Sequence, residues 1–233
     1  MSYGLTLALD GATYAGSVAL IRGTEVIAHR ELEEAGKPGR AGREELFMPM
    51  VADCLGDGKA AVRDLQRVVC GAGPGSFTSL RVAASIAKGI AVGASISLFS
   101  VPSLSLIVAD LNESDGRWLA VLPAMRGEVY VSLYELNGGV LREIQGPGII
   151  AEGDVEREAA RSGARIVGQT NQNQNGAVRV TRSPHARGAA RMMETIVGRG
   201  PVDIDSWEPQ YGRLAEAQVK WEAAHGRPLP ASV

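Results

Sequence analysis

The feature that most constrains the fold of this 233-residue chain is the run GAGPGSFTSLRVAASIAKGIAVGA at positions 71–94. A short apolar strand is predicted just before it, at 67–70, and a glycine–proline turn then leads into a helix. The hydroxyl group of Ser76 or Thr78 can accept an unpaired N–H of the first helical turn, so either residue is a candidate N-cap. A strand, a tight turn and a helix in this order favour the α/β class.

The helix is predicted to be covered on two sides, because it is apolar nearly all round. One side is rich in alanine, which lets a second helix approach closely, and the other carries larger aliphatic residues. We expect one side to pack on the parent sheet and the other on a helix of this or another chain. The alanine side holds Leu80, Ala84, Ala87, Ala91 and Ala94, the aliphatic side Val82, Ile86, Ile90 and Gly93, and the polar stripe Arg81, Ser85 and Lys88.

The glycine-rich turn is also a possible phosphate site, because backbone N–H groups at a helix start attract anions. Gly73, Gly75, Ser76 and Thr78 would then contact the ligand. However, no Lys-Ser or Lys-Thr follows the glycines, and the last glycine of the dinucleotide pattern GxGxxG is missing. A tight turn that leads into a buried helix is therefore the favoured interpretation.

Composition is typical of a folded globular protein, with 45% hydrophobic and 21% charged residues. The formal net charge of −2 favours neither a nucleic-acid nor a membrane partner. Cys54 and Cys70 stand in apolar contexts, so we expect packing residues in a reducing cytoplasm. The start of the chain has no basic stretch and no window of 18 apolar residues occurs, which predicts a cytoplasmic protein without a membrane span.

The first part of the chain is predicted to form an antiparallel meander of strands at 5–10, 16–21 and 25–29. A polar connection at 33–42 leads to a helix at 43–55, where Phe47, Met50, Val51 and Cys54 recur at helical spacing. Pro49 predicts a helix start or a kink near it. Phe47 and Met48 are expected in the core, and an exposed partner-binding surface is the alternative.

The rest of the chain alternates strands and helices, which predicts an α/β protein with mixed sheets. The polar segment 112–116 predicts a boundary between subdomains 1–111 and 112–233. Strands are predicted at 95–101, 118–122, 128–136, 140–144 and 164–167, helices at 102–111, 150–161 and 184–197, a polar loop at 169–176, and a tail from 206 that packs down through Trp207, Tyr211 and Trp221.

Few residues are candidates for chemistry. His29, His185 and His225 stand far apart without metal-ligand spacing, so ordinary surface or turn positions and no metal site are predicted. The nucleophile motif GxSxG is absent. Asp10 ends the first strand before a glycine-containing hairpin, where actin-like ATPases and sugar kinases place a metal–phosphate aspartate; a solvated turn is the alternative. Arg126 and Glu128 form a second polar cluster, or else a simple ion pair at a hairpin rim.

The chain resembles the TsaB (YeaZ) family in several motifs that occur in the right order. The segment GPGSFTSLRVAASIAKGIA at 73–91 resembles that family's signature GPGSFTGLRIG…AKGLA. The segment FMPMV at 47–51 resembles its LLPMV helix, RGEVY at 126–130 its DARxGEVY hairpin, and EPQYGR at 208–213 its terminal EPxYxR. The resemblance covers about residues 4–215.

The resemblance implies a fold like that of the actin, sugar-kinase and Hsp70 ATPases, with two α/β halves and catalytic capacity lost. It implies a scaffold that binds the catalytic paralogue TsaD through the first two helices, at about 43–55 and 79–93. With the ATPase TsaE, the complex would transfer threonylcarbamoyl from its adenylate to adenosine of ANN-decoding tRNAs, and tRNA would be reached indirectly. The implied interface residues are Phe47, Met48, Met50, Val51, Leu80, Arg81, Ala84, Ala87, Lys88 and Ala91.

By the same resemblance, the chain alone would bind no cofactor and form a homodimer, whereas ATP or ADP and a metal ion would belong to the complex with TsaD. Several positions depart from the family pattern. Ser79 and Ala84 replace glycines of the signature, Gly11-Ala12 replaces Thr-Ser, Arg43-Glu44 replaces His-Ser or His-Thr, and Pro123 and Met125 replace Asp and Arg. The competing hypothesis is an active ATPase or small-molecule kinase of the same superfamily that depends on Asp10.

Overall fold

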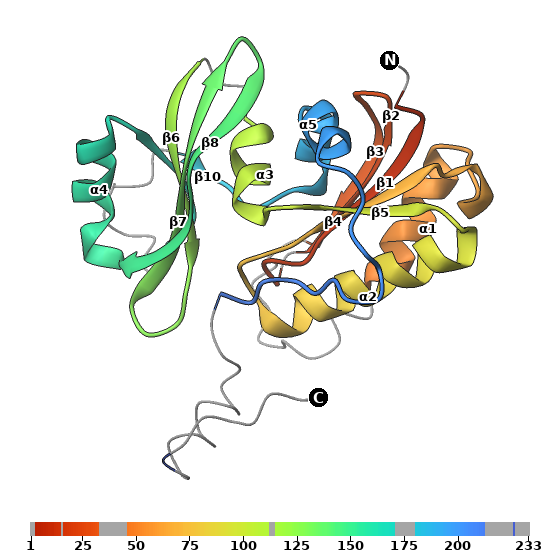
Figure 1. Cartoon of the computed structure of the whole chain (residues 1–233), viewed down its shortest axis with the longest axis horizontal. Helices are drawn as coiled ribbons and strands as arrows, with labels where there is room; N and C mark the ends of the chain where they lie inside the picture. The colour runs from red at the N-terminus through yellow and green to blue at the C-terminus, as the bar shows by residue number, and fades with distance from the viewer. Residues whose placement is uncertain are drawn as a thin grey trace.

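The computed structural model describes residues 3–14, 16–32, 46–111, 115–170, 180–212 and Gly226. Two five-stranded sheets form two lobes with helices between and outside them (Figure 1). The predicted connection 33–42, the proposed first residues of the helix at 43–55, most of the polar loop 169–176, Trp221 and His225 lie outside the described residues.

The first sheet has the strand order β3-β2-β1-β4-β5. Its first three strands form the predicted antiparallel meander, and β4 and β5 run parallel to β1. The carboxyl ends of the three parallel strands therefore meet at one edge, where Asp10 and Gly71 lie. The strands are β1 (Leu5–Asp10), β2 (Ser17–Arg22), β3 (Glu25–Glu31), β4 (Arg67–Gly71) and β5 (Ser97–Val101).

Two helices, α1 (Phe47–Asp57) and α2 (Phe77–Ala94), cover one face of the first sheet (Figure 1). Pro49 lies in the first turn of α1, where a missing N–H costs no helical hydrogen bond, so it marks a start and not a kink. Phe47, Met50, Val51 and Cys54 are buried against the sheet as predicted. Both cysteines are buried free thiols.

The structure shows which apolar side of α2 packs on the parent sheet. The alanine side faces its own sheet: Ala84, Ala87 and Ala91 are only 5%, 0% and 1% exposed. The aliphatic side is half-buried and packs in the same cluster, which also contains Val202, Ile204 and Trp207 of the C-terminal segment. The side that packs on the parent sheet is therefore the alanine side, whereas the chain covers the aliphatic side only in part and leaves Gly93 exposed.

The second sheet has the order β10-β9-β6-β7-β8, with β6, β7 and β8 antiparallel and β9 and β10 parallel additions. Helix α4 packs on its outer face. Helices α3 and α5 lie between the two sheets (Figure 1). The elements are α3 (Ser103–Ala109), β6 (Gly116–Pro123), β7 (Glu128–Asn137), β8 (Val140–Ala151), α4 (Val155–Ser162), β9 (Arg165–Gly168), β10 (Val180–Thr181) and α5 (Met193–Gly198).

Two predicted elements differ in type. Strand β8 continues to Ala151, so the helix expected from 150 begins only at Val155, after a 3-10 turn. The helix expected at 184–197 is two short pieces, the 3-10 helix η4 (Ala186–Ala190) and α5. Helix η4 lies so close to α3 that a Cβ at Gly188 would sit 2.8 Å from the Leu106 carbonyl oxygen.

A shared core joins the lobes. Apolar side chains of both sheets, among them Phe99 and Trp118, pack with α3 in one cluster. In the sequence, the strands of the first sheet all precede residue 111 and those of the second sheet all follow residue 112. However, the chain returns after residue 184 to pack on the first sheet. The division into subdomains 1–111 and 112–233 therefore stays a prediction.

Candidate functional site

Asp10 is a buried brace at the carboxyl edge of the first sheet. Its side chain accepts a hydrogen bond from the Ala12 N–H at 2.9 Å and another from the Ser103 hydroxyl at 2.5 Å. The same hydroxyl accepts a hydrogen bond from the Gly73 N–H at 3.0 Å. Asp10 therefore connects the end of β1 with the turn after β4 and the start of α3.

This environment leaves little room for a ligand at the Asp10 carboxylate. The residue is 1% exposed, and a Cβ at Gly71 would sit 1.9 Å from its Oδ2 atom. Burial raises the pKa of Asp10 to about 6, and the hydrogen bonds from Ser103 and Ala12 only partly offset that effect. Asp10 is thus neither the solvated turn residue nor the open metal–phosphate aspartate that the sequence suggested.

The glycine-rich turn is committed to internal contacts as well. The Ser76 N–H donates a hydrogen bond to the Ala12 carbonyl at 2.7 Å, and the Gly73 N–H donates to the Ser103 hydroxyl. A Cβ at Gly75 would sit 2.1 Å from the Ala12 oxygen. Ser76 is the N-cap of α2 by position, but its hydroxyl lies 3.2 Å from the Ser79 hydroxyl and makes no capping bond, while Thr78 is exposed. The predicted side-chain cap by Ser76 is therefore wrong.

Arg126 and Glu128 lie on the hairpin between β6 and β7. Arg126 is exposed and has a positive φ of 66°, and the Glu128 carbonyl accepts a hydrogen bond from Ala124 N–H at 2.9 Å. The turn supports the predicted hairpin, and the proposed role of these side chains in nucleotide contact stays a prediction.

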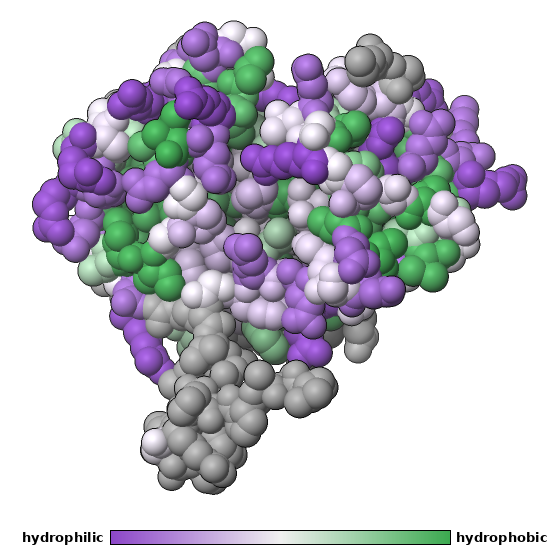
Figure 2. Space-filling view, in the orientation of Figure 1, coloured by the Kyte–Doolittle hydropathy of each residue, from purple (hydrophilic) through white to green (hydrophobic). Residues whose placement is uncertain are grey.

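The outward faces of α1 and α2 form a second candidate site, here called the docking face. It combines two exposed apolar side chains, Met48 at 51% and Val92 at 64% exposure, with small residues. A Cβ added at Gly56, Gly89 or Gly93 would meet nothing within 4 Å. Figure 2 shows hydrophobic residues among hydrophilic ones on the face where α2 lies. The exposed residues of this face are Met48, Ala52, Asp53 and Gly56 on α1, and Arg81, Ser85, Gly89, Val92 and Gly93 on α2.

The predicted interface residues divide into two groups. Met48 and Arg81 are exposed on the docking face, and the half-buried Lys88 has its Nζ atom 6.0 Å from the centre of the Trp207 ring. The other residues face the core and are at most 6% exposed, and their part in a partner interface stays a prediction. These are Phe47, Met50, Val51, Leu80, Ala84, Ala87 and Ala91.

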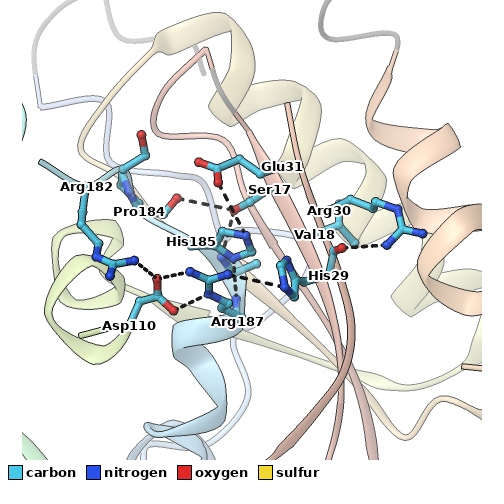
Figure 3. Close-up of polar contacts among 12 residues, drawn as sticks. Ser17, Val18, His29, Arg30, Glu31, Asp110, Arg182, Pro184, His185 and Arg187 are labelled. Carbon is cyan, nitrogen blue, oxygen red and sulfur yellow. Dashed lines mark hydrogen bonds and ion pairs between the residues drawn. The ribbon is translucent and has the colours of Figure 1, made fainter. Parts of the chain in front are cut away.

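A third polar cluster was missed by sequence reasoning, which treated the histidines as unrelated surface or turn positions. His29 of β3 and His185 before η4 meet edge to face, with ring centres 5.0 Å apart (Figure 3). Arg187 donates two hydrogen bonds to Asp110, at 2.5 and 2.8 Å, and Arg182 lies 3.4 Å from the same carboxylate. The cluster fixes the returning segment on the first sheet.

His185 is held neutral within this cluster. It is 2% exposed, and its Nδ1 atom accepts a hydrogen bond from the Arg187 N–H at 3.1 Å, which places its proton on Nε2. That Nε2 atom lies 3.9 Å from the Glu31 carboxylate. Burial, with the nearby Arg187 charge, lowers the pKa of His185 to about 4. Only the long-range contact of residues 29 and 185 reveals the cluster, so the sequence carried no local signal for it.

Within the described ranges, no group of three or more His, Cys, Asp or Glu side chains is arranged to hold a metal ion. Nor does any helix in this part of the chain have the length and apolar character needed to cross a membrane.

Comparisons with known proteins agree with this architecture. A family model described as TsaD, tRNA N6-adenosine threonylcarbamoyltransferase, matches residues 37–183. The tRNA threonylcarbamoyladenosine biosynthesis protein TsaB of Bacillus subtilis is 28% identical over 226 residues, which cover 92% of this chain and 96% of that protein. The protein of the same name from Escherichia coli is 37% identical over 131 residues, covering 55% of this chain and 54% of that protein.

The solved structure of YeaZ from Pseudomonas aeruginosa superposes on the chain with a TM-score of 0.72 at 24% identity, covering 89% of this chain and 99% of that one. This likeness concerns the fold. The predicted α/β fold of the actin-like ATPase type, with two mixed-sheet halves, is confirmed.

Proposed function

Because the chain belongs to the TsaD family, and within it to the TsaB (YeaZ) branch, we propose that it acts in the synthesis of threonylcarbamoyladenosine in tRNA as a non-catalytic scaffold subunit. Its partner is a catalytic TsaD-like paralogue, which transfers the threonylcarbamoyl group to adenosine of ANN-decoding tRNAs. A TsaE-like ATPase completes the complex, and tRNA is reached through the partner.

The docking face is the single observation that carries this proposal. Helices α1 and α2 expose small residues and two apolar anchors, Met48 and Val92, and the space above Gly56, Gly89 and Gly93 is open. Small residues let a second pair of helices approach closely, and apolar anchors supply buried area. A paralogue of the same fold carries a corresponding helix pair, so the two faces can meet about a pseudo-twofold axis. Without the partner, a second copy of the chain can occupy this face as a homodimer.

The buried state of Asp10 supports the non-catalytic part of the proposal. A metal–phosphate aspartate has to reach its ligand, whereas this carboxylate is enclosed by Gly71, Ala12 and Ser103. Nucleotide and metal then belong to the partner or to the assembled complex. The rival hypothesis of an ATPase or kinase requires Asp10 to be accessible.

Reconstitution of tRNA modification tests the proposal. The assay combines the TsaD-like enzyme, the TsaE-like ATPase, threonylcarbamoyl adenylate and an ANN-decoding tRNA, with or without this chain. We expect omission of the chain to abolish most of the product, and the Asp10→Asn variant, checked for folding, to restore it. Full modification without the chain contradicts the scaffold role, and folded Asp10→Asn that fails to restore product supports the ATPase or kinase instead.

A further inference from the structure

The segment that follows α5 runs back across the first lobe. Val202 N–H donates to the Leu98 carbonyl of β5 at 2.9 Å, and Gln210 N–H donates to the Ala72 carbonyl at 2.7 Å. Figure 1 shows this segment descending beside β5 and then passing along α2. Its backbone is therefore tied to the first lobe at the outer strand and again at the turn that precedes α2.

The last residues of this segment contact both lobes. The ring of Tyr211 lies against Phe77 of α2 with ring centres 4.5 Å apart. On the other side, the Tyr130 hydroxyl of β7 donates to the Tyr211 carbonyl at 3.2 Å. Upstream, Trp207 packs against the buried cluster of the first lobe, and the centre of its ring lies 6.0 Å from Nζ of Lys88 on α2. One short stretch thus touches the start and middle of α2 and a strand of the second sheet.

Two glycines make this close approach possible. Gly73 has a φ of +82°, and a Cβ there would sit 2.3 Å from the Gln210 carbonyl oxygen. Gly212 has a φ of +71°, and its Cβ would sit 2.5 Å from the Tyr130 ring and 2.9 Å from the Pro74 side chain. Any side chain at either position would push the segment away from the turn.

We propose that residues 207–212 form an intramolecular clamp that fastens the second lobe to the turn between β4 and α2. The clamp lies over Gly73, whose N–H is in the Asp10 network, so the clamp also covers that network from outside. A ligand that approaches the network across Gly73 has to displace the Gln210 carbonyl first. This inference goes beyond the scaffold role and does not depend on any partner.

Hydrogen exchange of the Gln210 amide, measured by NMR on the isolated full chain, reports directly whether the hydrogen bond from Gln210 to the Ala72 carbonyl is formed. The test variant is Gly212→Ala. The matched control is Gly23→Ala, because Gly23 has nearly the same φ, +66°, but nothing lies within 4 Å of its Cβ position. We expect exchange at Gln210 to be about tenfold faster in Gly212→Ala than in the wild type and unchanged in Gly23→Ala.

A second variant keeps the test decisive if Gly212→Ala disturbs folding. Tyr130→Phe removes only the hydroxyl that donates to Tyr211, and we expect Gln210 exchange to rise several-fold while other β7 amides stay protected. An exchange rate of the Gln210 amide equal to that of the wild type in both variants would contradict the proposed clamp. Since no partner is present in this experiment, that outcome would leave the scaffold proposal standing.

Discussion

Two buried titratable residues give the protein opposite responses to acid. Asp10 has a folded pKa near 6, above its ordinary value of 3.8, so the folded state binds its proton more tightly. The stability that this contributes is complete below pH 3.8 and is lost as the pH rises through about 6. His185 has a folded pKa of about 4, below its ordinary value of 6.5. Its contribution to stability is therefore present above pH 6.5 and is lost as the pH falls toward 4. The two effects oppose each other between about pH 4 and 6.

Removal of Asp10 titration should expose the histidine effect. Urea unfolding of Asp10→Asn between pH 4 and 6.5 is expected to show a free energy of unfolding that falls more steeply on acidification than that of the wild type. The difference between the two curves should change by up to about 3 kcal/mol across this window. Parallel curves would show that Asp10 titrates normally and is not enclosed.

The reverse holds for His185. The variant His185→Asn keeps an acceptor near the Arg187 N–H but cannot be protonated. We expect its free energy of unfolding to fall less than that of the wild type as the pH drops from 6.5 to 4, in the same urea experiment. Wild-type pH dependence in the variant would mean that His185 is accessible to protons in the folded state.

For single residues, the sequence identified Asp10 as a candidate but did not predict its environment, and it did not identify the histidine cluster. Asp10 stood out by its place at a strand end, but one of its hydrogen-bond partners is Ser103, 93 positions away. His29 and His185 are brought together only by the return of the chain over the first sheet. Such long-range contacts leave no local pattern in the sequence.

Helix α2 shows why an apolar face is not by itself an interface. The family resemblance placed its small alanines at an interface with another chain. In the structure they let α2 lie close to its own sheet, and Ala87 is 0% exposed. The strands and the existence of α1 and α2 were predictable because hydrophobic periodicity reports burial. Periodicity does not report which neighbour provides the burial, so it could not show that the alanine side packs on the parent sheet.

This packing predicts opposite effects for two neighbouring positions of α2. Ala87→Glu places a carboxylate in the core and should destabilise the chain by roughly 3 kcal/mol or more. Gly89→Ala adds a methyl group on the exposed side, where nothing lies within 4 Å, and should stabilise by about 0.5–1 kcal/mol. Thermal unfolding of the two variants checks this. An Ala87→Glu protein as stable as the wild type would place the alanines at the surface.

Across the whole molecule, the two lobes are joined by the core around α3, by the histidine and arginine cluster and by the clamp. These contacts occupy the face of the first sheet that lies opposite α1 and α2, so the two helices stay on the outside of the molecule. A scaffold of this kind offers its partner a fixed surface, and the docking face is the part of that surface formed by both helices. The proposed scaffold role therefore requires the TsaD-like paralogue to bind at this face.

Calorimetric titration of the TsaD-like paralogue with two matched variants tests that claim most directly. Val92 on α2 and Val140 on β8 are 64% and 65% exposed, so arginine at either position should leave the fold intact. We expect Val92→Arg to weaken binding at least about tenfold, by the loss of an apolar contact, and Val140→Arg to bind like the wild type. Equal affinity of both variants, or a loss only with Val140→Arg, would contradict docking through α1 and α2.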